Sequence, residues 1–195
     1  MKGREAMGVQ ETDAADAALL GRTAAGDANS FRSLFDRYYP IAYRFILKIT
    51  RRPELAEEAA SDALFDVWKG AGRFKGASKV STWILGIARH KALNALRTVK
   101  DDAWEDISAA EEEADPADGP AEILDERDRQ GRIRRALETL ATPHRAVLDL
   151  AFFHGLSYSE IAKVLDCPEN TVKTRVFHAK KKLSKALSAL AGEVS

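Results

Sequence analysis

Hydroxyl and cationic side chains recur at steps of three and four residues over positions 169–190, which is the spacing of one helix face. They are Thr171, Thr174, Arg175, His178, Lys181 and Lys182. The other side of this segment is apolar, and we expect it to be buried. It consists of Val172, Val176, Ala179, Leu183, Leu187 and Leu190. Cations attract phosphates and hydroxyls bond to base edges, so the pattern is typical of a helix that enters the DNA major groove.

A shorter helix is predicted directly before this segment. Ser157-Tyr158-Ser159-Glu160 fits a capping box, in which the serine hydroxyl and the glutamate carboxylate satisfy free backbone amides at a helix start. The chain then turns at Asp166-Cys167-Pro168, where proline suits the first turn of a new helix because its missing amide would have no partner. Two helices joined by a tight turn have the helix-turn-helix layout, and an ordinary helical hairpin with a solvated lysine face is the alternative.

Apolar residues also recur at helical spacing between positions 31 and 97, without the alternation of a strand. One helix is predicted over residues 54–68, and Gly70, Gly72 and Gly76 then interrupt the pattern. Another helix is predicted over residues 81–97, with an apolar side and a polar, basic side. The first side carries Ile84, Ile87, Ala88 and Ala95, and the second carries His90, Asn94 and Arg97.

Charge is distributed unevenly along the chain, although 30 basic and 30 acidic residues give no net charge. Residues 101–128 are rich in Asp and Glu and contain a single base, Arg127. Pro116, Gly119, Pro120 and few large apolar residues complete this segment, so it cannot bury enough surface to order itself and is interpreted as a linker. Residues 163–185 are basic, which favours local attraction to phosphates.

The composition argues against several other classes of protein. No apolar run approaches the roughly 18 residues that span a bilayer, and positions 1–16 do not resemble a signal peptide, so we expect a cytoplasmic protein without membrane insertion. The single cysteine, Cys167, and four scattered histidines do not suggest a disulfide, a metal site or a cofactor. Nor do they offer a converging nucleophile and base, so we do not expect an enzyme.

Two sets of residues together resemble the extracytoplasmic-function (ECF) group of bacterial RNA polymerase sigma factors. The first set is AASDALFDVW at 59–68, Phe74, and STWILGIARHKALNALR at 81–97. The second set is GLSYSEIA at 155–162 and NTVKTRV at 170–176. Either part of the second set alone would indicate only a helix-turn-helix, but both sets occur in order at either end of the acidic segment.

The resemblance implies an all-α fold of two small helical domains joined by a flexible acidic linker. Residues 17–99 would form sigma region 2, a helical bundle that binds core polymerase and the promoter -10 element. Residues 126–195 would form region 4, which binds the -35 element. Residues 100–125 would be the linker, and residues 1–16 a disordered N-terminus. The expected partners are core RNA polymerase, through its beta-prime and beta subunits, promoter DNA, and an anti-sigma factor that controls the protein.

The resemblance also implies three sets of binding residues. Core polymerase would be bound by Ser61, Asp62, Phe65 and Asp66. The -10 element would be opened and bound by Arg73, Phe74, Lys75, Lys79, Thr82, Trp83, His90, Lys91, Asn94 and Arg97. The -35 element would be recognised by Ser157, Tyr158, Asn170, Thr171, Lys173, Thr174, Arg175, His178, Lys181 and Lys182. Aromatic rings can replace lost base stacking and cations can follow a single strand. For Trp83, packing beside Ile84 and Ile87 is the preferred interpretation.

Two positions depart from the family pattern, and two other functions remain open. Ser61 stands where glutamine is common, and Asn170 where glycine is common, which bears on docking strength and on the preferred -35 sequence.

A sigma mimic that occupies an anti-sigma factor would not need the basic face of the last helix. A helix-turn-helix repressor would account for the C-terminal part alone and leave residues 31–97 without a role.

Overall fold

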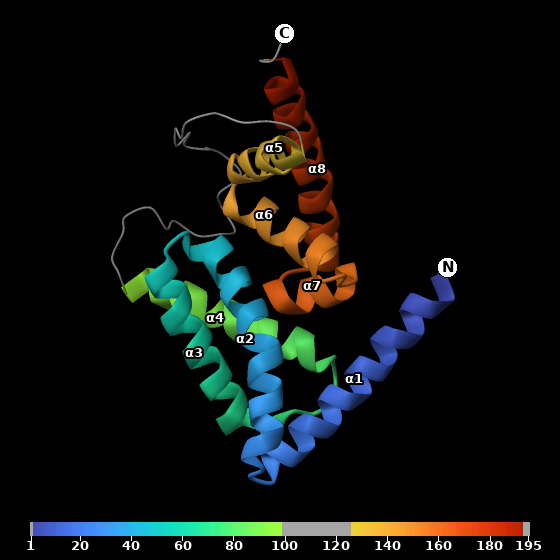
Figure 1. Ribbon diagram of the computed structural model, residues 1–195, viewed down its shortest axis with the longest axis vertical. Coiled ribbons are helices and arrows are strands. Elements are labelled where there is room, and N and C mark those ends of the chain that lie inside the picture. The colour runs from blue at the N-terminus through green and yellow to red at the C-terminus, as the bar shows by residue number, and fades with distance from the viewer. Residues whose placement is uncertain (1, 99–125, 193–195) are drawn as a thin grey trace. The chain divides into compact units, whose positions relative to one another are not determined.

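The computed structural model describes residues 2–98 and 126–192, and the side chains of residues 13–98 and 131–189. These residues form helices and no strands, which confirms the predicted all-α fold. They make two compact units, one dominated by helices α1 to α4 and the other by α5 to α8 (Figure 1). The predicted linker, residues 100–125, lies outside the described residues.

Three mutually packed helices build the core of the first unit: α2 (Ala28–Thr50), α3 (Pro53–Gly70) and α4 (Val80–Thr98). Arg51 ends α2 in a left-handed conformation with φ of 54°, and its amide donates to the Leu47 carbonyl, so that α3 can begin two residues later at Pro53. Apolar residues at helical spacing face inward from all three helices. They include Leu34, Phe45, Ile46, Leu64, Val67, Ile84 and Leu85.

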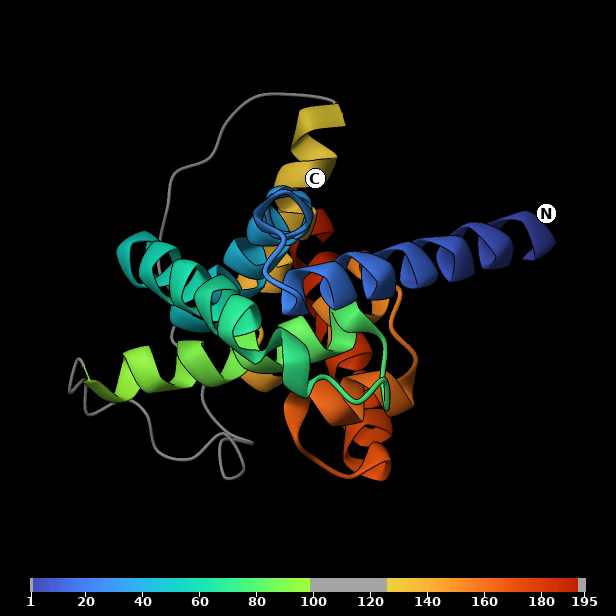
Figure 2. The same cartoon turned by 90° about the horizontal axis from the view of Figure 1, so that it is seen from below.

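Helix α1 (Lys2–Ala24) differs from the disordered segment expected over residues 1–16. Its C-terminal part packs against α2, and the helix also contacts α4 and the short 3-10 turn η1 (Ala71–Arg73), while its N-terminal part leads away from α2 (Figure 2). Asp16 and Leu20 are each only 1% exposed. The Asp16 carboxylate accepts hydrogen bonds from the Arg37 guanidinium and the Tyr38 hydroxyl, both on α2. This polar anchor and the buried Leu20 together tie α1 to the unit.

The second unit contains α5 (Glu126–Glu138), α6 (Thr142–Leu148), η2 (Asp149–Phe153), α7 (Tyr158–Leu165) and α8 (Glu169–Gly192). Helix α8 packs against both α5 and α6. The predicted apolar side of α8 is buried only in its first half, at Val172, Val176 and Ala179. Leu183 and Leu187 are half-buried, and the side chain of Leu190 lies outside the described set.

The segment after α6 is a π-helical turn, η2, in which the His154 amide donates to the Asp149 carbonyl five residues earlier. An i→i+5 turn shifts the register of the side chains by one residue. In a regular helix Phe152 would lie on the same side as the buried Leu148, four residues earlier. Phe152 and Phe153 are both exposed.

No helix in the described part of the chain is both long enough and apolar enough to cross a lipid bilayer.

Candidate functional site

The predicted capping box at the start of α7 is confirmed. The Ser157 amide donates to Glu160 Oε2 at 2.8 Å, and the Glu160 amide donates back to Ser157 Oγ at 3.3 Å. These reciprocal bonds satisfy two backbone donors that the first turn of a helix leaves free. They fix the direction in which α7 leaves the preceding turn, with Ser157 and Tyr158 on the surface.

A three-residue turn joins α7 to α8. Asp166 adopts the left-handed conformation with φ of 46°, which places the Cys167 amide 3.1 Å from the Ala162 carbonyl and closes the end of α7. The Pro168 carbonyl then accepts from the amides of Thr171 and Val172, which starts α8. The turn therefore has helix-turn-helix connectivity, and Cys167 is one of its half-buried turn residues.

The solvent face of α8 carries Asn170, Thr174, Phe177 and Lys181, at intervals of four, three and four residues. Thr174 Oγ1 donates to the Asn170 carbonyl at 3.0 Å, which holds the threonine against its own helix. His178, Lys173 and Lys182 are also exposed.

Two residues predicted for the last helix are less exposed than this row, and a third is exposed but has an ion-pair partner. Thr171 and Arg175 are half-buried on the flank of α8, and Arg175 Nη1 lies 4.0 Å from Cys167 Sγ. Lys173 Nζ lies 3.0 Å from Glu169 Oε1, so part of its charge is already balanced. Side chains that face solvent without such neighbours are better placed to contact a major groove.

The first unit presents an aromatic and basic region where η1 leads into α4. The rings of Phe74 and Trp83 lie 5.2 Å apart between centroids at an angle of 46°. Trp83 also packs over Gly70, where an added Cβ would lie 3.5 Å from the indole. The indole as a whole is half-buried. Arg73 and Lys75 are exposed beside this pair. Lys79 Nζ lies 3.8 Å from the Asp13 carboxylate of α1.

Thr82 does not belong with the exposed residues of this region. Its side chain is 3% exposed, and its hydroxyl has no hydrogen-bond partner within the described residues. It lies in the first turn of α4, three residues before the buried Leu85, so the helix itself turns it inward. A hydroxyl in this position cannot reach DNA without movement of α4, which corrects its place among the predicted -10 residues.

The middle and the C-terminal end of α4 carry the remaining predicted residues. His90 and Arg97 are exposed, and Asn94 is half-buried with its amide 3.3 Å from His90 Nδ1. Lys91 points toward α3, where its Nζ lies 2.9 Å from Asp66 and 3.6 Å from Asp62. The hydrogen bond to Asp66 raises the pKa of the Lys91 ammonium. Lys91, predicted to bind the -10 element, therefore pairs with two residues predicted to bind core polymerase, and it does not face outward like its neighbours.

The predicted polymerase-binding face of α3 is exposed. Ser61 and Asp62 face solvent, and the Ser61 hydroxyl donates to the Glu57 carbonyl at 2.9 Å. Phe65 is 53% exposed, with Lys69 Nζ 4.0 Å from the centroid of its ring. An uncovered phenylalanine flanked by carboxylates is typical of a protein-binding surface.

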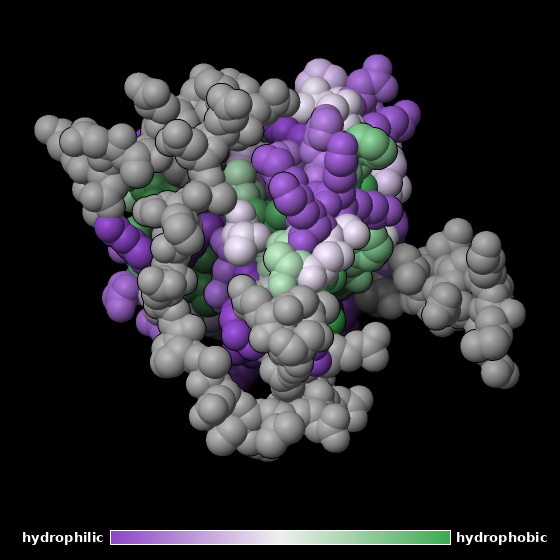
Figure 3. Space-filling model, turned by 90° about the horizontal axis from the view of Figure 1, so that it is seen from above, coloured by the Kyte–Doolittle hydropathy of each residue, from purple (hydrophilic) through white to green (hydrophobic). Residues whose placement is uncertain are grey.

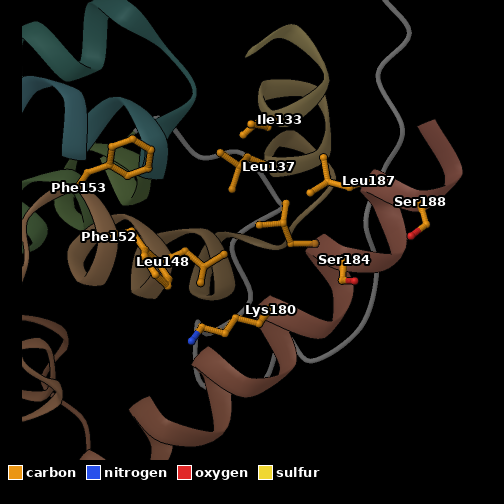
Figure 4. Close-up of a pocket in the computed structure, with 10 residues that line it drawn as sticks. Ile133, Leu137, Leu148, Phe152, Phe153, Lys180, Ser184, Leu187 and Ser188 are labelled. Carbon is orange, nitrogen blue, oxygen red and sulfur yellow. The ribbon is translucent and has the colours of Figure 1, made fainter. Parts of the chain in front are cut away.

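An apolar groove in the second unit was not predicted from the sequence. It has a volume of about 580 Å³, and Figure 4 shows side chains from α5 and α8 pointing into it from opposite sides. Figure 3, which views one face of the molecule, likewise shows hydrophobic residues at the surface among hydrophilic ones. Two features mark its position: the second half of the α8 apolar row is only half-buried, and the register shift at η2 exposes two phenylalanines. Its lining includes Ile133, Leu137, Phe152, Phe153, Leu183 and Leu187.

Within the described residues, no group of three or more His, Cys, Asp or Glu side chains is arranged to hold a metal ion.

Comparison with protein families finds two matches along the chain. Residues 34–101 match the family described as Sigma-70 region 2, and residues 130–183 match the family described as Sigma-70, region 4. The chain is 30% identical over 164 residues to the ECF RNA polymerase sigma factor RpoE of Cereibacter sphaeroides, covering 83% of this chain and 88% of that protein. It is 28% identical over 193 residues to the RNA polymerase sigma-H factor of Pseudomonas aeruginosa, covering 93% and 98%.

Solved structures show the same fold. CnrH, in complex with the cytosolic domain of CnrY, superposes with a TM-score of 0.65 at 21% identity, covering 90% of this chain and 98% of that chain. The sigma factor RpoE from Bartonella quintana, in complex with the anti-sigma factor NepR, superposes with a TM-score of 0.62 at 22% identity, covering 83% and 98%.

Proposed function

The chain belongs to the ECF group of RNA polymerase sigma factors, and from that premise we propose that it binds core RNA polymerase, recognises the promoter -35 and -10 elements, and opens the DNA to start transcription. The observation that carries this proposal is the pairing of two surfaces on one chain. A helix-turn-helix presents the exposed polar row of α8, and a separate unit presents aromatic and basic side chains at the start of α4.

We assign recognition of the -35 duplex to the solvent face of α8 and the start of α7. Asn170 and Thr174 carry the hydrogen-bonding groups suited to base edges, and Lys181 carries a charge suited to phosphate. The flank residues Thr171 and Arg175 contribute from the side of the helix. The remaining members of this proposed set are Ser157, Tyr158, Lys173, His178 and Lys182.

We assign strand opening at the -10 element to the region around η1 and the outer face of α4. Stacking on Phe74 and on the half-buried Trp83 offsets the base stacking that melting removes, while the cations beside them follow the separated strand. Thr82 is left out of this set because it is buried. The other members are Arg73, Lys75, Lys79, His90, Lys91, Asn94 and Arg97.

Protein partners are assigned to two other surfaces. Ser61, Asp62, Phe65 and Asp66 form the proposed face for the beta-prime subunit of polymerase, where exposed carboxylates and an apolar ring suit a partner with basic and apolar side chains. The apolar groove of the second unit is the proposed contact for a helix of the beta subunit, in the helix-in-groove mode. Leu187→Asp should weaken binding to the beta subunit, and unchanged binding would remove the groove from this role.

Control by an anti-sigma factor is part of the proposal. The solved structure of CnrH is a complex with the cytosolic domain of CnrY, and that of RpoE is a complex with the anti-sigma factor NepR. We propose that an anti-sigma factor likewise binds this chain and keeps it inactive. We place the protein in the cytoplasm with core polymerase, and we assign it no catalytic step of its own.

In vitro transcription with core polymerase over a pool of randomised promoters tests the function. Start sites that appear only when this protein is added, and that share a -35 and a -10 sequence, are the expected result. Asn170→Ala should change the preferred -35 sequence. Lys181→Ala should weaken all promoters alike and lower the salt dependence of binding by about one ion. Failure to bind core polymerase, or binding without initiation, would contradict the proposal and favour a sigma mimic.

A further inference from the structure

The apolar groove of the second unit lies between α5 and α8 (Figure 4). Leucine, isoleucine and phenylalanine side chains form its walls, and the polar side chains among them are Lys180, Ser184 and Ser188. Phe152 and Phe153 are 63% and 67% exposed, so both rings present most of their surface to solvent. An apolar groove of this kind is typical of a binding site for a segment with apolar residues at helical spacing.

Cations line and flank this groove. Lys180 is one of the lining residues, and its Nζ lies 5.2 Å from the centroid of the Phe152 ring. Lys181 and Lys185 of α8 are exposed, and each directly follows a lining residue in the chain. The same holds for Arg134 of α5. An occupant that complements this surface therefore carries carboxylates beside its apolar side chains.

The chain itself contains a segment of this composition. Residues 101–110 read DDAWEDISAA, with four carboxylates and no base. Trp104 and Ile107 are three residues apart, a spacing that places two side chains on one side of a helical turn. A tryptophan beside an aliphatic residue is a common anchor pair in helix-in-groove recognition. The segment thus combines the apolar anchors and the negative charge that complement the groove.

The position of this segment in the chain brings it within reach of the groove. Trp104 precedes Glu126, the first residue of α5, by 22 residues, and Ile133 of α5 lines the groove. A chain of that length can span up to about 70 Å, whereas the 24 residues of α8 extend over only about 36 Å. Tethering also gives the segment an effective concentration at the groove in roughly the millimolar range, so a weak contact is enough to fill it.

We propose that residues 101–110 dock in the apolar groove of the free chain, with Trp104 and Ile107 against its apolar walls and the neighbouring carboxylates beside its cations. The beta-subunit helix assigned to this groove must then displace the segment, and this second step alone rests on the proposed function. Competition lowers the affinity for polymerase according to the fraction of molecules in which the groove is filled. Filling of about one half lowers the affinity twofold, and filling of about nine-tenths lowers it tenfold.

A nitroxide label in the groove reports the docking, because a nitroxide quenches tryptophan fluorescence only at close range. The label is attached to Ser188→Cys, a lining position, in the full-length chain with Cys167→Ser. Comparison with the same labelled chain carrying Trp104→Phe separates the emission of Trp104 from that of Trp68 and Trp83. We expect strong quenching of Trp104 that decreases as salt is added, because salt screens the paired charges.

Three variants control for the label, the segment and the groove. The label on Ser159→Cys, an exposed position of α7 that does not line the groove, should leave the emission of Trp104 unchanged. Ser108→Ala alters a polar residue of the same segment and should leave the quenching from position 188 intact. Leu187→Asp places a carboxylate in the groove wall and should abolish this quenching.

Binding to core polymerase measures the competition. Trp104→Ala should increase the affinity of the chain for core polymerase by the factor that the quenched fraction predicts, whereas Ser108→Ala should leave it unchanged. Quenching together with unchanged affinity in Trp104→Ala would uphold the docking and remove the beta subunit from the groove. Failure of that part of the proposed function is therefore distinct from failure of this inference.

The inference is overturned if the label on Ser188→Cys quenches Trp104 no more than the label on Ser159→Cys. It is also overturned if the quenching arises between two chains. Mixing an unlabelled chain with a labelled chain that carries Trp104→Phe detects this case, because quenching in the mixture would identify a second copy as the occupant.

Discussion

Replacing Asp16 by alanine is expected to detach helix α1 from the first unit. The Asp16 carboxylate is 1% exposed and bonds to Arg37 and Tyr38 of α2. In Asp16→Ala the Tyr38 hydroxyl remains buried without this acceptor, which costs about 1–3 kcal/mol. The Arg37 side chain is 42% exposed and can be hydrated, so it adds little. We therefore expect a loss of about 2 kcal/mol in the free energy of unfolding.

Urea unfolding followed by tryptophan fluorescence measures this loss in the first unit, which contains Trp68 and Trp83. The third tryptophan, Trp104, is replaced by phenylalanine in every variant so that the signal comes from this unit. Asp36→Ala, at an exposed position on α2, is the matched control and should change stability by less than about 0.5 kcal/mol.

Tyr38→Phe provides a second check on the same reasoning. Added to Asp16→Ala, it removes the stranded hydroxyl and should recover about 1 kcal/mol of the loss. The anchoring role of Asp16 is refuted if Asp16→Ala matches the Asp36→Ala control, or if the second substitution makes the loss larger.

The same cluster predicts a dependence on pH. Burial, followed by the bond to Asp16, raises the pKa of Tyr38, so folding favours the neutral phenol. This contribution is complete below the pKa of an unfolded tyrosine, about 10, and is lost as pH rises above that value. Between pH 9.5 and 11, wild type should lose more stability than Tyr38→Phe.

Three further substitutions have defined outcomes. Asp13→Asn removes the carboxylate beside Lys79. Holoenzyme should then bind promoter fragments up to about fivefold more tightly, with a steeper salt dependence. Equal or weaker binding would contradict the pairing. Thr82→Val replaces a buried hydroxyl without a described partner, so the melting temperature should stay the same or rise. A loss of DNA opening at unchanged stability would instead indicate that Thr82 contacts DNA. Ser157→Ala should lower the free energy of unfolding by about 1 kcal/mol, and hydrogen exchange at the Glu160 amide should accelerate. Unchanged exchange would show that the capping bonds contribute nothing.

The features that the sequence predicts correctly depend on residues close together in the chain. The capping box needs only Ser157 and Glu160, three residues apart, and the buried start of α8 needs only the three- and four-residue spacing of Val172, Val176 and Ala179. Both follow from the geometry of a single helix. The all-α class follows for the same reason, because periodicity is a local property.

The features that the sequence does not predict depend on distant residues or on irregular backbone. Helix α1 is fixed by bonds from Asp16 to residues 21 and 22 positions away, which no local pattern reveals. Lys91 is placed by the resemblance among the residues that bind DNA, yet its ammonium lies beside carboxylates of α3. The lining of the apolar groove includes Phe152 and Phe153 of η2, an irregular turn that a regular helical period does not predict.

The Lys91 ion pairs have a consequence for how this sigma factor could change between its free and bound states. One ammonium lies beside both Asp66 and Asp62 of the proposed polymerase face, while its backbone belongs to the helix assigned to the -10 strand. If a basic side chain of polymerase paired with Asp66, Lys91 would lose the nearer of its two carboxylate partners. If that loss increased the affinity of Lys91 for DNA, thermodynamic reciprocity would require bound DNA to increase the affinity for polymerase by the same factor. Assembly and promoter engagement would in this way be linked through a single side chain.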